Sequence, residues 1–303
     1  MQHRFSLSLA AALLALSFGA QADAARDPQR LSCASGTAGT QAGKKASADD
    51  KLDVVALTAD GRLVCFNEHK PAKARLIGMV NGLQGDTRVV GIDFRVQDGQ
   101  LYGVGDTGGI YTLSTANATA TLVNRLSVPL SGTTFGVDFN PAADRLRIVS
   151  DAGQNLRHNV NPNGVTLADG TLNYTAGTPA SGIVAAAYTN NDLSPATPAT
   201  TGTTLFVLDA TQDQVVLQSP PNAGSLMATG KLTVDVPSAT GFDIYSVLRD
   251  GITVANRALA TAPAADGSVE LYSVDVLTGK AQPRGKLAAG LSVVDIAVPL
   301  SQN

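Results

Sequence analysis

One aspartate recurs at the same place in a repeated four-residue pattern, Gly-apolar-Asp-apolar. It is Asp93, Asp138 and Asp243 in three copies, and Asp295 occupies a near-copy that lacks the glycine. Ca²⁺ takes several oxygen ligands of this kind, so convergent carboxylates could hold a cation. Alternatively, each carboxylate accepts hydrogen bonds from neighbouring groups and fixes one repeat against the next. Because four unpaired carboxylates repel one another, the pattern predicts hydrogen-bond partners, protonation or a bound cation.

A second set of candidate ligand-binding residues lies in the densest polar run of the chain. The candidates there are Asn140, Arg147, Gln154, Asn155 and Arg157. Arginine recognises carboxylates and sulfates through paired hydrogen bonds, and amide side chains can bind sugar hydroxyls. The same run also alternates arginine with apolar residues, which is typical of a strand with one polar face. A structural role for this set therefore stays open beside the binding role.

The sequence offers no convincing catalytic set. His69 and His158 lack a recognisable Ser or Cys setting, and no Gly-x-Ser-x-Gly elbow is present. We therefore predict no catalytic residue, no cofactor and a non-enzymatic protein. The alternative is a carbohydrate-active or lactone-type hydrolase that uses the inner aspartates, with Ca²⁺ as its possible cofactor. The absence of Trp and an aromatic content of 5% count against a platform for stacking sugars.

The aspartate pattern repeats at a spacing typical of a β-propeller. Its copies begin near residues 91, 136, 185, 241 and 293, and the copy at 185 lacks the aspartate. A repeat of this length indicates propeller blades. Within each repeat, short β-rich runs alternate with turn signals such as Asp98-Gly99 and Asp250-Gly251. No sustained helical periodicity interrupts them.

The two ends of the repeat region predict how the ring closes. Residues 53–80 supply three strand candidates and residues 292–298 supply one. Pairing that last strand with the first three completes a blade and hides exposed sheet edges. We therefore predict an all-β fold, a five-bladed β-propeller of four-stranded antiparallel blades closed by the C-terminal strand. Six blades remain an alternative, because the Pro/Thr/Asn-rich insert at 190–202 makes one repeat irregular.

Several segments carry a resemblance to a known family. Residues 131–141, 144–150 and 153–157, together with 182–191 and 220–226, resemble the bacterial exported family named domain of unknown function 4394. The similarity extends over roughly residues 50–299. The resemblance implies a propeller-like β fold and export, and it brings no established activity.

The N-terminus has the three parts of a secretory signal. Arg4 precedes an apolar run over residues 5–20, and Ala20-Gln21-Ala22 predicts cleavage after Ala22. We therefore expect a signal peptide at 1–22, a flexible polar arm at 23–50 and a single propeller domain at 51–303. The apolar run is short for a spanning helix, so we expect a periplasmic or extracellular protein with no membrane span after cleavage.

The two cysteines and the net charge limit the compartment and the kinds of partner that we expect. Cys33 and Cys65 both follow the cleavage site, and an exported even pair predicts one disulfide that pins the arm to the folded body. A net charge of −3 without a basic stripe argues against a nucleic-acid partner. We expect a monomer that binds or scaffolds an unidentified small molecule, glycan or protein. A structural envelope or matrix component with no small ligand is the remaining alternative.

Overall fold

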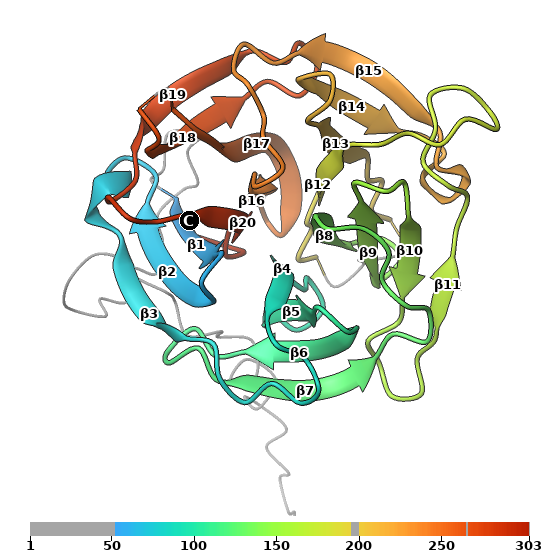
Figure 1. Cartoon of the computed structure of the whole chain (residues 1–303), viewed down its shortest axis with the longest axis horizontal. Coiled ribbons are helices and arrows are strands. Elements are labelled where there is room, and N and C mark those ends of the chain that lie inside the picture. Colours follow the sequence, from blue (N-terminus) through green and yellow to red (C-terminus); the bar gives the residue numbers. More distant parts are fainter. Residues whose placement is uncertain (1–51, 195–199, 265, 303) are drawn as a thin grey trace, which may run out of the picture.

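The computed structural model describes residues 52–194, 200–264 and 266–302. The predicted signal peptide, its cleavage after Ala22, the arm at 23–50 and Cys33 lie outside the described residues. Within them, twenty strands form five four-stranded antiparallel sheets arranged in a ring (Figure 1). Two short 3₁₀ turns lie in the connections between strands. This confirms the all-β, five-bladed propeller, and the six-bladed alternative is wrong.

Each blade runs from an innermost strand at the ring centre to an outermost strand at the rim. The first blade, from the centre outwards, contains β20 (Val293–Ala297), β1 (Asp53–Thr58), β2 (Arg62–Asn67) and β3 (Arg75–Met79). The second contains β4 (Val89–Phe94), β5 (Leu101–Gly105), β6 (Gly109–Leu113) and β7 (Ala120–Arg125). The third contains β8 (Phe135–Asn140), β9 (Arg145–Ser150), β10 (Asn155–His158) and β11 (Thr166–Ala168). The fourth contains β12 (Ile183–Tyr188), β13 (Leu205–Asp209), β14 (Gln214–Gln218) and β15 (Leu226–Lys231). The fifth contains β16 (Phe242–Arg249), β17 (Ile252–Pro263), β18 (Val269–Val274) and β19 (Ala281–Lys286).

The last strand closes the ring as the sequence predicts. β20 pairs antiparallel with β1, with Val55 opposite Ala297 and Ala56 opposite Ile296. The first blade is thereby built from both ends of the propeller, and β1 has no free inner edge. In Figure 1, β20 lies at the centre of the ring beside β1.

The insert that made one repeat irregular lies between two regular strands. It connects β12 to β13, whose pairing runs from Ile183 opposite Asp209 to Tyr188 opposite Leu205. The fourth blade therefore has the same four-stranded sheet as the others. A tight turn at Asp250-Gly251 likewise joins β16 to β17, and both residues have positive φ, the geometry that favours Asp-Gly in hairpins.

The apolar core lies between neighbouring blades. Five clusters of buried side chains each join two adjacent blades around the ring. The innermost strands β4 and β12 are buried at every position because both of their faces are covered. The outermost strand β7 instead alternates buried or half-buried residues with exposed ones. Polar side chains on innermost strands therefore need partners inside the protein.

Candidate functional site

The four repeated aspartates all lie on innermost strands, as predicted. Asp93 is on β4, Asp138 on β8, Asp243 on β16 and Asp295 on β20, and all four are buried. One carboxylate oxygen from each of Asp93, Asp138 and Asp243 lies within 4.8 Å of the others. These three residues are the ones that could hold a cation at the centre of the ring.

Hydrogen bonds give each aspartate a structural role between blades. Each carboxylate accepts a backbone N–H from the innermost strand of the next blade or from the residue just after it. The bonds are Ile92 to Asp295 at 2.8 Å, Phe139 to Asp93 at 2.7 Å, Tyr188 to Asp138 at 3.0 Å and Val298 to Asp243 at 2.5 Å. They join the first blade to the second, the second to the third, the third to the fourth and the fifth to the first. We call this set the aspartate bridges.

The glycine of the repeated pattern is required by the same contact. A Cβ on Gly91 would lie 2.3 Å from Cγ2 of Val137, and one on Gly136 would lie 2.5 Å from the backbone carbon of Ala185. A side chain at either glycine would thus hold the neighbouring innermost strands apart. The glycine therefore permits the close approach that lets the aspartate two residues later reach a backbone amide of the next blade.

Burial raises the pKa of every bridging aspartate. Loss of solvation is the largest cause, and it takes the pKa of Asp243 from 3.8 to about 7. The pKa values of Asp93 and Asp138 are raised further by repulsion from the nearby carboxylates. The centre of the ring therefore favours protons on these groups at neutral pH.

The fourth and fifth blades have no aspartate bridge. Where the other repeats carry the aspartate, β12 reads Ala185-Ala186-Ala187. Among the described residues, no carboxylate on β12 therefore accepts a backbone N–H from β16. This is the one blade interface whose innermost strands lack the shared bond.

Structural contacts account for the polar candidates of the third blade. The Arg147 side chain is 2% exposed and donates to Asn155 and Asp169 at 2.6 and 2.7 Å. The same guanidinium donates to Asn222, which precedes β15 of the fourth blade. Arg157 shares Asp169 at 2.7 Å. These side chains form a buried polar network that ties the third blade to the fourth.

The remaining candidates of that run hold loops in place. The Asn140 side chain accepts the amides of Ala142 and Ala143, which closes the turn after β8. The Gln154 side chain accepts the amide of Ser131 and donates to the carbonyl of Pro129. A ligand role for this run stays a prediction, while the structure supplies an internal partner for each of its five side chains.

The two histidines lie in different surroundings. His158 is buried between Thr166 and Asn124, with both ring nitrogens 2.9 Å from a side-chain oxygen. Burial lowers its pKa to about 4, so the ring is neutral at physiological pH. His69 is exposed and lies 3.7 Å from the Glu68 carboxylate.

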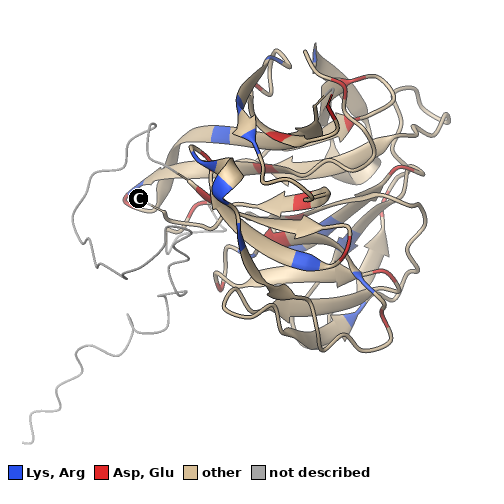
Figure 2. Cartoon of the chain, turned by 60° about the vertical axis from the view of Figure 1, so that its left-hand side comes forward, with Lys and Arg blue, Asp and Glu red and all other residues tan. Residues whose placement is uncertain are grey.

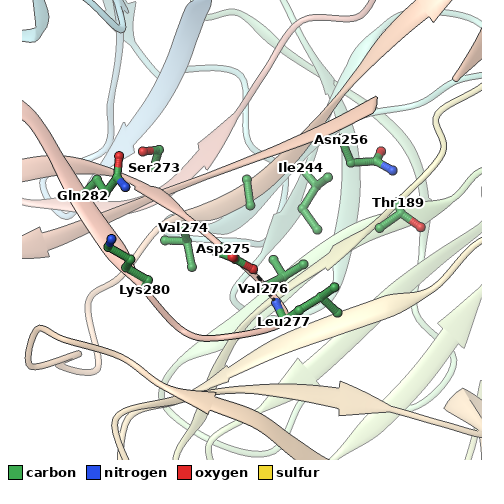
Figure 3. A pocket seen from close by; sticks show the side chains of 11 residues that line it. Thr189, Ile244, Asn256, Ser273, Val274, Asp275, Val276, Leu277, Lys280 and Gln282 are labelled. Carbon is green, nitrogen blue, oxygen red and sulfur yellow. Dashed lines mark hydrogen bonds between the residues drawn. The ribbon is translucent and has the colours of Figure 1, made fainter. Parts of the chain in front are cut away.

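A cleft between the fourth and fifth blades was not foreseen from the sequence. It has a volume of about 610 Å³, which falls in the range of roughly 300–1,000 Å³ typical of small-molecule sites. Its lining is Thr189, Ile244, Asn256, Ala258, Ser273, Val274, Asp275, Val276, Leu277, Lys280 and Gln282. In Figure 3, Lys280, Gln282 and Ser273 lie toward one end, Asn256 and Thr189 lie toward the other, and aliphatic side chains lie between them.

One sequence signal could have located this cleft. Its residues are scattered over β16 to β19 and form no motif, so none of them is conspicuous alone. The missing aspartate in the repeat at 185, however, marks the same interface.

The mouth of the central channel offers a much smaller hollow. It measures about 160 Å³, and its lining includes Arg88, Thr133, Thr134 and Ser238. These residues precede innermost strands, whereas the cleft opens beside the loop after β12 and the turn between β18 and β19. The hollow is below the usual size of a site for a small organic ligand.

The distribution of charged residues over the structure is in keeping with the small net charge of the chain. Basic and acidic residues are interspersed along the ribbon in Figure 2, in keeping with a net charge of −3. Among the residues that the structure describes, no helix is both long and apolar enough to cross a membrane. Cys65 is buried on β2, and because Cys33 is outside the described residues, the disulfide stays a prediction.

Comparison with known proteins identifies a family. No curated protein matches the sequence. A structure of a protein of unknown function from Bacteroides thetaiotaomicron is 12% identical, covers 85% of this chain and 69% of its own, and has a TM-score of 0.45. An auxiliary nutrient binding protein from Bacteroides ovatus is 13% identical, with coverages of 76% and 58% and a TM-score of 0.38. Glutaminyl cyclase from Myxococcus xanthus is 15% identical, with coverages of 70% and 71% and a TM-score of 0.38. The model of the family described as Domain of unknown function (DUF4394) matches residues 62–297, and the chain belongs to that family.

Proposed function

We propose that the protein is an exported, non-enzymatic binding module whose small ligand occupies the cleft between the fourth and fifth blades. The observation that carries this proposal is the cleft itself, a space of about 610 Å³ at the one interface without an aspartate bridge. The bridges and the Arg147 network are engaged in internal hydrogen bonds, whereas the Lys280 side chain lies at one end of the cleft (Figure 3).

The chemistry of the lining supports binding over catalysis. Hydrolysis by paired carboxylates needs two such groups on opposite sides of the scissile bond. The described lining of the cleft contains one, Asp275, whose Oδ1 accepts the amides of Leu277 and Thr278 at 3.0 and 3.3 Å. The lining side chains are suited to hold a ligand by hydrogen bonds and aliphatic contact.

Binding in the cleft is tested with a variant that fills it. Val276 is half-buried in the turn after β18, lines the cleft and packs against the core between the fourth and fifth blades, so Val276→Trp places a large ring there. Thr115 holds the corresponding place in the turn after β6, because the two turns share the same backbone hydrogen bonds. Thr115→Trp is therefore the matched control.

The measurement is ligand-observed NMR with a panel of amino acids, short peptides, organic acids and neutral sugars as probes. We expect at least one probe to bind the wild-type protein and Thr115→Trp and to lose binding in Val276→Trp. Binding that survives in Val276→Trp, or a panel with no binder, contradicts the proposal.

The export part of the proposal rests on the signal-like residues 1–22 and on the cysteine pair. A disulfide between Cys33 and Cys65 would form in an oxidising compartment. Labelling of the native exported protein with a thiol reagent under denaturing, non-reducing conditions should find no free thiol. Two reactive thiols would rule out the disulfide and remove one support for export.

A Ca²⁺-dependent hydrolase is the second candidate, favoured by the convergence of Asp93, Asp138 and Asp243 within 4.8 Å. Elemental analysis of the purified protein separates the two functions. A stoichiometric calcium ion that is lost in Asp138→Asn would support the hydrolase. A metal-free protein whose melting temperature does not change with chelator leaves these aspartates as groups that fix the blades.

A further inference from the structure

Two oppositely charged residues of one turn line the cleft. Asp275 and Lys280 lie in the connection between β18 and β19, and both side chains are exposed. The pKa of Asp275 is lowered, first by the hydrogen bond from the amide of Leu277, next by hydrogen bonds from Thr278 and least by the positive charge of Lys280. Neither Asp275 nor Lys280 forms an ion pair with any other residue in the described part of the chain. The cleft thus presents a positive group and a negative group on one turn, and the negative group already accepts local hydrogen bonds through Oδ1.

Lys280 suits a carboxylate. Its side chain lies toward one end of the cleft in Figure 3. The ammonium of lysine donates hydrogen bonds, and carboxylate oxygens accept from donors of this kind. A lone anion would gain from Lys280 but would be repelled by Asp275. A ligand with both charges gains from both residues.

The centre of the cleft is aliphatic. Ile244, Val274, Val276 and Leu277 line it, and the Leu277 side chain is 68% exposed. No aromatic side chain is present in the described lining, so a sugar ring finds no stacking surface there. Exposed leucine beside other aliphatic groups instead offers apolar area for a branched aliphatic side chain.

We infer that the ligand of the cleft is a small aliphatic zwitterion, a free amino acid or a short peptide, with its carboxylate at Lys280 and its ammonium at Asp275. This inference rests on the proposed binding function of the cleft and names the class of ligand. The aliphatic side chain of the ligand packs against Leu277 and Ile244.

The test compares four probes that differ in one charge at a time. Leucine and leucyl-leucine carry both charges, leucinamide lacks the carboxylate, and isocaproate lacks the ammonium. Calorimetric titration of the full mature protein should show binding of leucine or leucyl-leucine and at least about tenfold weaker binding of leucinamide and isocaproate, the loss expected for one charged hydrogen bond.

Two variants remove one protein charge each without reshaping the turn. Lys280→Met keeps the aliphatic stem of the side chain. Asp275→Asn keeps an oxygen that can accept the Leu277 amide, now 3.0 Å from Asp275 Oδ1. Each variant should weaken binding of the zwitterion about tenfold. Lys280→Met should also weaken binding of isocaproate, because it removes the positive charge that faces the carboxylate of this probe. Lys73→Met is the control, because Lys73 is exposed on the first blade and does not line the cleft.

The outcomes separate this inference from the proposed function. If the four probes bind equally, or if neither variant changes affinity, the zwitterion assignment is wrong. If none of the four binds while another probe of the broader panel binds and is excluded by Val276→Trp, the cleft is a binding site for a different class of ligand. If Val276→Trp excludes nothing, both the assignment and the proposed function fail.

Discussion

At the scale of single residues, the repeated aspartates act between blades. Each bridge joins a buried carboxylate to a backbone amide of the next blade. For Asp93, Asp138 and Asp243, a glycine two residues earlier avoids a side chain that would push the neighbouring strand away. Such carboxylates are costly to ionise because burial opposes their charge. The two predictions that follow concern the carboxylate and the glycine.

Between about pH 4 and 7, the stability of the protein should fall as pH rises. The pKa of Asp243 is about 7 in the folded protein and 3.8 without burial, so the folded state binds its proton more tightly. The stabilisation is complete below about pH 4 and is lost as pH approaches 7, at about 1.4 kcal/mol for each pH unit and each proton. Urea unfolding at several pH values should show this slope.

In Asp243→Asn that slope should be shallower, whatever the overall loss of stability. Asp235→Asn, at an exposed carboxylate outside the bridges, is the control and should keep the wild-type slope. A slope of opposite sign between pH 4 and 7 would show that the central carboxylates are ionised and stabilised by an unseen partner such as a cation.

Gly136→Ala should destabilise the propeller through the contact between the third and fourth blades. The added Cβ would meet the backbone of Ala185 at 2.5 Å, so an innermost strand must move. We expect a loss of roughly 1–3 kcal/mol, the usual cost of overpacking. Gly202→Ala, where nothing lies within 4 Å, should change stability by less than about 0.5 kcal/mol in the same urea titration. Equal stability of the two variants would contradict the close-approach role of Gly136.

Among the polar contacts of the third blade, the Arg147 network should contribute most to the free energy of unfolding. Arg147→Met would leave the buried Asp169 carboxylate with Arg157 as its remaining ion-pair partner and would remove one hydrogen bond to the buried amide of Asn155. Removing one partner of a buried ion pair costs about 3–5 kcal/mol. Arg145→Met on the same strand should cost less than about 1 kcal/mol, because that side chain is half-buried and donates to loop carbonyls. Thermal unfolding of both variants tests this, and a small effect at Arg147 would refute it.

At the scale of elements, the strands and their order were predictable because they depend on local pattern. The three strands expected in residues 53–80 correspond to β1, β2 and β3, and the strand expected at 292–298 corresponds to β20. Burial of both faces makes the innermost strands mostly apolar, and turn residues separate the strands clearly. The irregular repeat was ambiguous because its insert hides the spacing between β12 and β13, although the strands themselves are ordinary.

The closing strand gives a prediction at this scale. Truncation before Val293 removes β20, exposes the edge of β1 and deletes the Asp295 bridge. We expect the truncated protein to lose cooperative unfolding, monitored by circular dichroism. A synthetic peptide of residues 290–303 should restore it by pairing with β1. Cooperative unfolding of the truncated protein at the wild-type temperature would show that the ring does not depend on this closure.

At the scale of the whole molecule, the ring is held by bridges at four of its five blade interfaces, and the ligand-sized cleft lies at the fifth. The sequence predicted the bridging aspartates because a repeat places them at one position. It did not reveal the cleft, because Thr189 and Lys280 come together only when two blades pack side by side. Residues that come from two different blades have no fixed spacing along the chain. A sequence pattern therefore cannot reveal the site that they form together.

The most direct test of this account is a methyl-resolved NMR titration that locates the bound ligand. With valine, isoleucine and leucine methyl groups labelled, leucyl-leucine or the best binder of the panel is added to the mature protein. The account predicts shifts of Ile244, Val274, Val276 and Leu277 in the cleft and none of Val89, Val90 or Val294 at the channel mouth. Shifts confined to the channel mouth would contradict the assignment of function to the cleft.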